Sequence, residues 1–199
     1  MTARVPGDDG VGDLVRRARD GDGRAFEDLV RRYRPRIFAL ALHVTGSEPD
    51  ADDVAQEVFL RAYRSLQAFE GRGGFFNWIY RIALHLAFDR RREHARRAGP
   101  SLDDPRLERA VAVDAGGNPQ RAAAIRQIYR RLLAAMDALS PTLRATIILV
   151  CLQGMSHPEA AAVLGTTPGT IAWRIHEARA QLRAAVTAAP GPRPPPPPA

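Results

Sequence analysis

The sequence predicts an all-α protein made of two small helical domains joined by a flexible linker, the C-terminal domain being a helix-turn-helix. Apolar residues recur at spacings of three and four along most of the chain, which is the period of an amphipathic helix. Two capped helix starts lie on either side of a tight turn between Met155 and Val186. The stretch from Ala98 to about Pro119 lacks periodicity and contains several prolines and glycines, so residues 98–120 are expected to be the linker.

The first domain is expected over residues 11–97, after a disordered segment at residues 1–10. Pro35 interrupts an amphipathic run and is expected to kink or divide that helix. Acidic residues at the start of the following run favour the positive end of a helix dipole. The expected elements are helical segments over 26–44 and 50–68, a glycine-rich loop over 70–74 and a last helix over 75–97.

The second domain is expected over residues 121–187. Strong periodicity from Ile125 to Leu139 predicts one helix, and Ser140 with Pro141 marks the start of another that ends near Leu152. These two helices would supply the core on which the helix-turn-helix packs. Residues 188–199 are mostly proline and are expected to be an extended, solvated tail.

The helix-turn-helix itself is predicted from its capping residues. Ser156 and Glu159 have the spacing of a capping box, and Thr167 followed by Pro168 marks a second helix start. Gly165 stands where the first helix would end. Such a pair of helices commonly places its second helix in the DNA major groove. An ordinary helical hairpin with a basic surface is the alternative.

The second helix of this motif would have one buried and one open face. Ala172, Trp173 and His176 lie opposite its apolar stripe, and Arg174 and Arg179 flank that stripe. The stripe consists of Ile171, Ile175, Ala178, Leu182 and Val186.

Composition is compatible with a nucleic-acid partner. The chain has 199 residues, with 29 Lys and Arg against 22 Asp and Glu, for a formal net charge of +7. Every strong base is arginine, which pairs bidentately with phosphates and guanine edges. Because genomic base composition also favours arginine, the bias itself carries little functional weight.

Several classes of site and location are not expected. The single cysteine, Cys151, excludes an internal disulfide and lies in an apolar run, so a buried thiol is expected. No apolar stretch approaches the roughly 20 residues that span a bilayer, and the N-terminus lacks a signal-peptide core, so a cytoplasmic protein without membrane insertion is expected. The scattered histidines form no catalytic or metal-binding pattern. We therefore expect no enzymatic activity, no metal and no cofactor.

A second nucleic-acid signal follows the glycine-rich loop. Aromatic residues crowd together between Phe75 and Tyr80, and a dense arginine segment follows from Arg90 to Arg97. Aromatic rings stack on unpaired bases while arginines track the backbone. The alternative is that most of these rings belong to the core, and at least half of them are expected to be buried.

The order of these segments resembles the extracytoplasmic-function (ECF) branch of bacterial sigma factors, from about Leu14 to Val186. Three runs carry the resemblance jointly: D-A-x-D-x-x-Q-E-x-F, W-x-Y-R-I-A and L-G-x-x-x-G-T-I-x-x-R-x-H-x-A-R. The first two resemble conserved region 2 of that family, and the third resembles region 4.

The resemblance implies a protein that binds the clamp and flap of core RNA polymerase, recognises promoter DNA and is controlled by an anti-sigma factor. The implied polymerase contacts are Asp53, Gln56, Glu57 and Leu60. The implied contacts to the −10 element, where a flipped base is captured and the strand opened, are Arg72, Phe75, Asn77, Trp78, Arg81 and His85. The implied contacts to the −35 duplex are Thr170, Ala172, Trp173, Arg174, His176 and Arg179.

Some positions depart from the pattern of the family. Leu84 and His85 replace a frequent arginine and asparagine, Phe76 replaces a polar residue, and Ala172–Trp173 replaces a frequent lysine–serine pair. These departures bear on promoter sequence rather than on membership. A conventional helix-turn-helix repressor or activator and a pure protein-interaction module are the alternative functions.

Overall fold

The computed structural model describes residues 10–71, 73–98 and 118–187, and it contains helices and no strand within those ranges. The predicted N-terminal segment and proline-rich tail fall outside the described residues, as do most of the predicted linker and Arg72. The chain divides into two compact units. The first comprises residues 1–101 with 145–174, and the second comprises 102–144 with 175–199.

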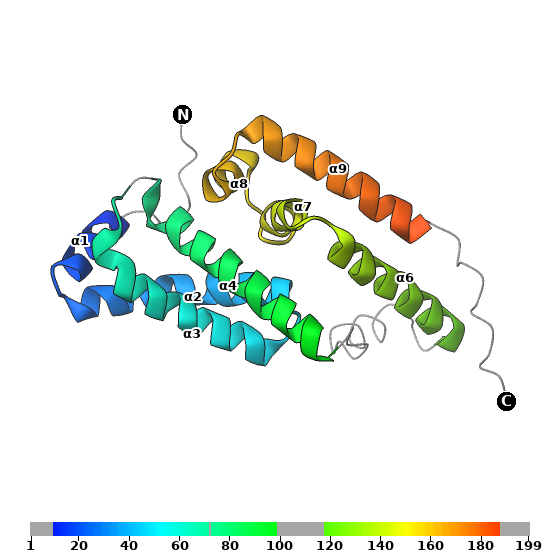
Figure 1. Ribbon diagram of the computed structural model, residues 1–199, viewed down its shortest axis with the longest axis horizontal. Coiled ribbons are helices and arrows are strands. Elements are labelled where there is room, and N and C mark those ends of the chain that lie inside the picture. Colours follow the sequence, from blue (N-terminus) through cyan, green and yellow to red (C-terminus); the bar gives the residue numbers. More distant parts are fainter. Residues whose placement is uncertain (1–9, 72, 99–117, 188–199) are drawn as a thin grey trace. The chain divides into compact units, whose positions relative to one another are not determined.

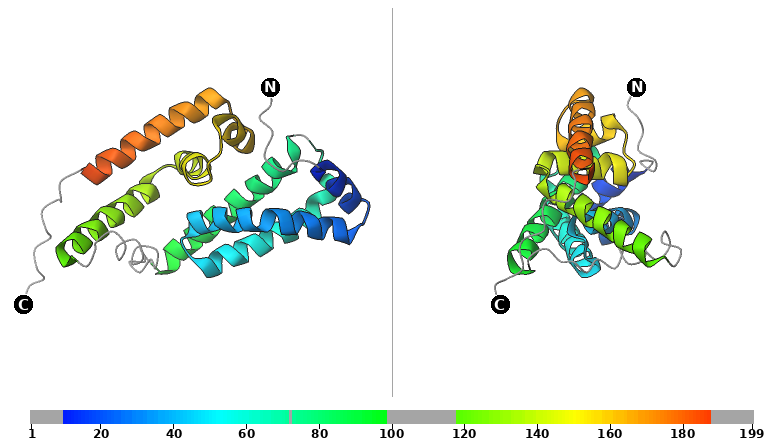
Figure 2. Two further views of the ribbon diagram at one scale, coloured as in Figure 1. Left: turned by 180° about the vertical axis from the view of Figure 1, so that it is seen from behind. Right: turned by 90° about the vertical axis from the view of Figure 1, so that its right-hand side faces the viewer.

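A bundle of three long helices forms the centre of the first unit. α2 (Gly23–Thr45), α3 (Glu48–Ser65) and α4 (Gly74–Ala98) each contact the other two, and the short α1 (Val11–Arg19) packs against α2 and α4 (Figure 1). Figure 2 shows the same bundle from behind, with α2 in front of α4. The interior is apolar and combines aliphatic side chains with aromatic rings, and burial of each large apolar side chain stabilises the fold by about 1.5–3 kcal/mol. Its fully buried members include Leu29, Ile37, Leu40, Val58 and Ile79.

Polar side chains define where the bundle helices begin. Asp22 accepts hydrogen bonds from the amides of Arg24 (3.0 Å) and Ala25 (3.2 Å) at the start of α2. Ser47 accepts one from the Asp50 amide at the start of α3 (3.3 Å). These bonds satisfy amides that have no partner within the helix. After α3 the chain makes one 3₁₀ turn, η1 (Leu66–Ala68), before the glycine-rich loop.

Pro35 does not divide α2. The helix continues through it from Gly23 to Thr45, with the proline on the exposed face. A proline removes one helix hydrogen bond, but the carbonyl that loses its donor on an exposed face can bond to water. Buried residues on both sides of the proline, Leu29 and Ile37 among them, hold the two halves in one core.

The helix-turn-helix has the capped geometry that the sequence predicts. In α8 (His157–Leu164), the Ser156 amide donates to Glu159 Oε2 (2.8 Å) and the Glu159 amide donates to Ser156 Oγ (3.4 Å), which completes the capping box. Gly165 ends α8 at φ 64°, a left-handed conformation that glycine adopts without strain. α9 (Pro168–Thr187) follows, and its Thr170 amide donates to Thr167 Oγ1 (3.2 Å).

The preceding segment departs from the prediction at Cys151. α6 (Pro119–Ala138) and α7 (Pro141–Ile147) match the two expected helices, but the chain then forms a π-helical turn, η2 (Ile148–Leu152). The wider turn keeps Ile148 and Leu149 in the core and leaves Cys151 exposed. The expectation of a buried thiol was therefore wrong, because a π turn changes the angular step that places residues on the buried face.

Candidate nucleic-acid interface

The four predicted polymerase contacts lie on one face of α3. Asp53, Gln56 and Leu60 are exposed and Glu57 is half-buried, at positions that follow one another at the helical period. Leu60 keeps 43% of its surface exposed, and Glu57 accepts a hydrogen bond from Arg61 Nε at 2.7 Å. The result is an apolar side chain among carboxylate and amide groups, an arrangement suited to a protein contact.

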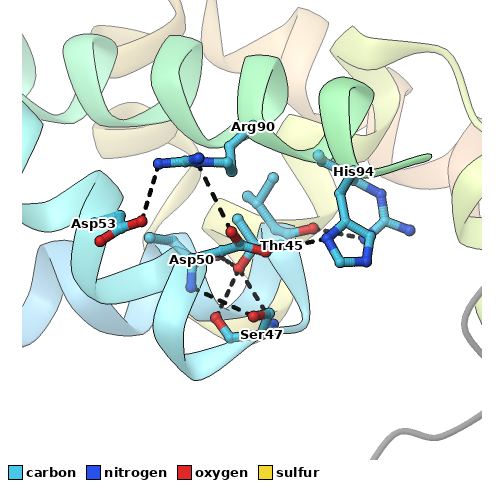
Figure 3. A network of polar contacts seen from close by, with 9 residues as sticks. Thr45, Ser47, Asp50, Asp53, Arg90 and His94 are labelled. Atoms are coloured by element: carbon cyan, nitrogen blue, oxygen red, sulfur yellow. Dashed lines mark hydrogen bonds and ion pairs between the residues drawn. The ribbon is translucent and has the colours of Figure 1, made fainter. Parts of the chain in front are cut away.

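A polar network that the sequence pattern did not reveal holds the start of this face (Figure 3). Arg90, from α4, donates to Asp53 Oδ2 at 3.1 Å and lies 3.8 Å from Asp50 Oδ1. His94 Nδ1 lies 3.4 Å from the other oxygen of Asp50. The dense arginine segment therefore includes at least one residue that orients an acidic side chain. No local pattern marks the pairing, because the partners are 37 residues apart.

The aromatic residues after the glycine-rich loop divide into core and half-exposed groups. Phe75, Phe76 and Tyr80 are buried, as expected for at least half of them, while Trp78 is half-buried. Burial raises the pKa of Tyr80 to about 12, so its phenol stays neutral at physiological pH. The Trp78 ring lies 4.8 Å from that of Phe69, a residue that the sequence reasoning did not select.

An open cavity lies where α1, the glycine-rich loop and the start of α4 meet. Its volume is about 320 Å³. Phe75, a predicted −10 contact, is only 3% exposed and lines this cavity. Asn77, another predicted contact, donates to the Gly73 carbonyl at 2.5 Å and so ties α4 to the loop. The cavity is lined by Val11, Gly12, Val15, Arg16, Arg19, Phe69, Gly71, Gly74 and Phe75.

Three further predicted −10 residues share a face of α4. Trp78, Arg81 and His85 follow one another at spacings of three and four, and the last two are exposed. Arg81 donates to the backbone carbonyls of Ala162 and Val163, both at 2.7 Å and within the same compact unit. These three side chains are therefore gathered in one place, as the spacing predicts.

The open face of α9 carries the predicted −35 contacts. Ala172, Trp173 and His176 are exposed, Arg174 is half-buried and Arg179 is exposed. Trp173 has 61% of its surface exposed, so most of its indole does not pack against the neighbouring helix. Thr170 is half-buried, and its hydroxyl lies 2.9 Å from that of Thr167. Thr170 thus takes part in the start of the helix as well as in its surface.

Ile171, Ile175 and Ala178 are buried in the stripe opposite this face, as expected, whereas Leu182 and Val186 are half-buried. In α8, the apolar positions expected to be buried from the sequence are Ala160, Ala161 and Leu164. The first two are buried, but Val163 is buried in place of Leu164, which is half-buried. Within the described residues there is no group of three or more histidine, cysteine or acidic side chains that could hold a metal ion. In the same ranges, no helix combines the length and apolar character needed to cross a bilayer.

Comparison with protein families places two conserved regions in this chain. Residues 29–97 match Sigma-70 region 2, and residues 129–182 match Sigma-70 region 4. The first match contains α3, the glycine-rich loop and nearly all of α4, and the second contains α8 and most of α9. Together they define a sigma factor, the class of protein that directs RNA polymerase in transcription initiation.

Individual relatives show to which branch of the sigma factors the chain belongs. ECF RNA polymerase sigma factor SigE of Mycolicibacterium smegmatis is 35% identical over 89% of this chain and 68% of the relative. ECF RNA polymerase sigma-E factor of Escherichia coli is 35% identical over 83% of this chain and 88% of the relative. The chain belongs to the ECF sigma factors, and the expected resemblance is confirmed.

Two solved structures share the fold. The structure of CnrH in complex with the cytosolic domain of CnrY aligns with a TM-score of 0.60 and 32% identity, covering 86% of this chain and 93% of CnrH. The sigma factor RpoE in complex with the anti-sigma factor NepR from Bartonella quintana aligns with a TM-score of 0.51 and 21% identity, covering 81% and 96%. The second likeness concerns the fold alone.

Proposed function

We propose that this sigma factor contacts its promoter at two places, with α9 binding the −35 duplex and the glycine-rich loop with α4 binding the opened −10 strand. The observation that carries the proposal is the exposed face of α9, which presents Trp173, His176 and Arg179 on a capped second helix of a helix-turn-helix. Residues near the start of such a helix reach base edges in the major groove, and arginines contact phosphates.

The proposed −10 site combines stacking surface with positive charge. Trp78 is half-buried against Phe69 and offers the rest of its indole to solvent, while Arg81 and His85 lie on the same face of α4. Removing a base from the stack costs a few kcal/mol, which aromatic and cationic contacts to the flipped base can offset. Arg72 belongs to this proposal by its position in the sequence.

The α3 face is the proposed contact with the polymerase clamp. Leu60 supplies apolar area at its centre, and Asp53, Gln56 and Glu57 supply polar contacts around it. Catalysis then belongs to the polymerase rather than to this chain. The site of action follows from that partner, which transcribes the bacterial chromosome in the cytoplasm.

Control by an anti-sigma factor is proposed from the family to which the chain belongs, and the similar protein CnrH is seen with a bound protein partner, the cytosolic domain of CnrY. The exposed apolar side chains of this chain, including Leu60 and Trp173, are surfaces that an inhibitor could cover. A tagged chain expressed in non-inducing cells should recover a protein that blocks its transcription activity when added back. Recovery of core polymerase without such an inhibitor would contradict this part of the proposal.

Run-off transcription tests the promoter function directly. Purified chain and core polymerase are incubated with a genomic library, and the start sites are sequenced. The expected result is a set of starts that share −35 and −10 sequences and that disappear when either component is omitted. Specific duplex binding by the chain without any association with core polymerase would instead indicate a conventional repressor or activator, and a gel shift without polymerase separates the two.

A further inference from the structure

The polar network at the start of α3 differs from an ordinary surface ion pair, because one guanidinium contacts two carboxylates (Figure 3). Arg90 Nη2 donates to Asp53 Oδ2 at 3.1 Å, while Arg90 Nε lies 3.8 Å from Asp50 Oδ1. We propose that Arg90 is a positioning residue for polymerase binding, which holds the Asp53 carboxylate in the orientation that the polymerase contacts. The inference rests on the polymerase contact proposed above for the α3 face, and it adds α4 to the elements that build that face.

The two carboxylates of this bridge differ in exposure. The Asp50 side chain has 19% of its surface exposed, whereas the Asp53 side chain has 62%. Asp50 is therefore the anchored end of the bridge, and Asp53 is the end that is open to a partner. Arg90 is half-buried between them and belongs to α4, so the bridge joins the two helices.

Asp50 is itself held by its neighbours at the junction of α2 and α3. Its amide donates to Ser47 Oγ at 3.3 Å, and the Ser47 amide donates to Thr45 Oγ1 at 3.3 Å. His94 Nδ1, from the next turn of α4, lies 3.4 Å from Asp50 Oδ2. A guanidinium placed against this carboxylate thus has a fixed base from which to reach Asp53.

Orientation matters for Asp53 because an exposed side chain loses rotamer freedom when it enters an interface. The hydrogen bond from Arg90 restricts the carboxylate before the polymerase arrives. It uses Oδ2 only, and a carboxylate accepts several hydrogen bonds, so capacity for a donor on the polymerase remains. Pairs between partly exposed side chains contribute little to folding, so the expected effect of this bridge is on binding rather than on stability.

The test is a double-mutant cycle on the full chain. Its readout is affinity for core polymerase, measured without DNA by competition with labelled wild-type chain. Arg90→Gln is expected to weaken binding about fivefold, because ordering one side chain at an interface costs a factor of about this size. Asp53→Ala should weaken binding at least as much. In the Asp53→Ala background, Arg90→Gln should change affinity by less than about twofold, since no carboxylate is left to position.

Three outcomes would contradict the inference in different ways. Equal losses from Arg90→Gln in both backgrounds would overturn the positioning role, because Arg90 would then act through the fold or by direct contact. Tighter binding by Arg90→Gln would also overturn it, since the guanidinium would then compete with the polymerase for Asp53. Wild-type affinity in Asp53→Ala would instead contradict the proposed polymerase contact on which the inference rests.

The matched control removes an arginine from the same end of α4. Arg92 is exposed, lies two residues further along the helix and pairs with Asp89 of the same helix. Arg92→Gln should leave the affinity for core polymerase unchanged. A loss equal to that of Arg90→Gln would show that only the charge of this segment matters, and it would overturn the proposal.

Two further variants test the bridge itself. Arg90→Lys keeps the charge but replaces a planar fork with a single ammonium, so its affinity should lie between those of wild type and Arg90→Gln. Full affinity in Arg90→Lys would overturn the bridge. Asp50→Asn should weaken binding about twofold when Arg90 is present and have no further effect in Arg90→Gln, because the two residues act as a unit. Additive losses would contradict the anchoring role of Asp50. Circular dichroism checks that each variant keeps its helical content.

Discussion

Trp173 is an indole on the open side of a helix whose apolar residues Ile171 and Ile175 are buried. An exposed aromatic of this size contributes nothing to the core, and its position near the start of α9 places it where a recognition helix meets bases. The resemblance described above also implies a small polar residue at this position in the family. These facts make Trp173 the residue at which this chain's promoter preference is expected to differ from that of its relatives.

Trp173→Ala should therefore change promoter selection without changing stability. We expect about a tenfold loss of run-off product from the preferred −35 sequence and a relaxed preference at one base pair, because one good base contact is worth about 1–3 kcal/mol. The measurement is transcription from a library randomised across the −35 element. Tyr63→Ala, which removes a comparably exposed ring from α3, should leave the −35 preference intact. An unaltered −35 preference in Trp173→Ala would contradict a role of Trp173 in recognising the −35 sequence.

Leu60 is the corresponding apolar residue on the α3 face. Leu60→Ala should weaken binding to core polymerase about tenfold, because the minority of interface residues whose truncation costs more than about 1 kcal/mol cluster near the centre of an interface, where we propose that Leu60 lies. Competition for core polymerase with labelled wild-type chain measures this. Leu152, another exposed leucine, provides the control, because Leu152→Ala removes a similar side chain from η2. Equal losses in both variants would show that the α3 face is not the specific contact.

At the scale of elements, the starts of α8 and α2 are determined by their capping residues. Ser156→Ala removes one half of the capping box and should destabilise α8 by about 1 kcal/mol. Faster amide hydrogen exchange in α8 would show this loss of stability. Ser65→Ala is the control, because that hydroxyl donates to the Arg61 carbonyl at the end of α3 and caps no helix start. Unchanged exchange in α8 would mean that tertiary packing alone maintains the helix.

Asp22 gives the start of α2 a dependence on pH. The hydrogen bond from Arg17 (2.7 Å), together with the Ala25 amide, lowers the pKa of Asp22 below its usual 3.8. A carboxyl with a lowered folded-state pKa stabilises the fold above its unfolded pKa, and that contribution is lost as pH falls through the lowered value.

The comparison of wild type with Asp22→Asn isolates this charge, because asparagine can still cap the helix. Wild type should melt at a higher temperature than the variant near neutral pH. The difference should shrink as the pH falls below about 4 and through the lowered pKa of Asp22. Thermal unfolding followed by circular dichroism across this range is the measurement. A difference that stays constant with pH would show that the carboxylate does not contribute through its charge.

At the scale of the molecule, stability rests on the bundle of α2, α3 and α4. Leu29 is fully buried in that bundle, and Leu29→Ala should lower the free energy of unfolding by about 2–5 kcal/mol through lost burial and a residual cavity. Leu60→Ala is the matched surface variant and should stay within about 0.5 kcal/mol of wild type. Urea denaturation measures the free energy of unfolding of both variants. A comparable loss in both would contradict the assignment of core and surface.

Local patterns predicted much of the architecture. The helix-turn-helix could be located because its caps depend on residues within three positions of one another, as with Ser156 and Glu159. Helical periodicity also identified Ile171 and Ile175 as buried and Trp173 as lying opposite them. It could not separate a packed ring from an accessible one at Phe75 and Trp78, since that depends on which other helices cover them.

The sequence by itself determined the all-helical class, the capped helix-turn-helix and membership of the ECF sigma factors, because these depend on spacing along the chain. Only the tertiary structure decided that Arg90 orients Asp53 and that Arg16 and Arg19 meet Phe69 and Phe75 around one cavity. It also decided that the π turn exposes Cys151. The pairings join segments tens of residues apart, and the exposure of the thiol depends on how one turn packs. Neither the pairings nor the exposure of the thiol produces a periodic pattern in the sequence.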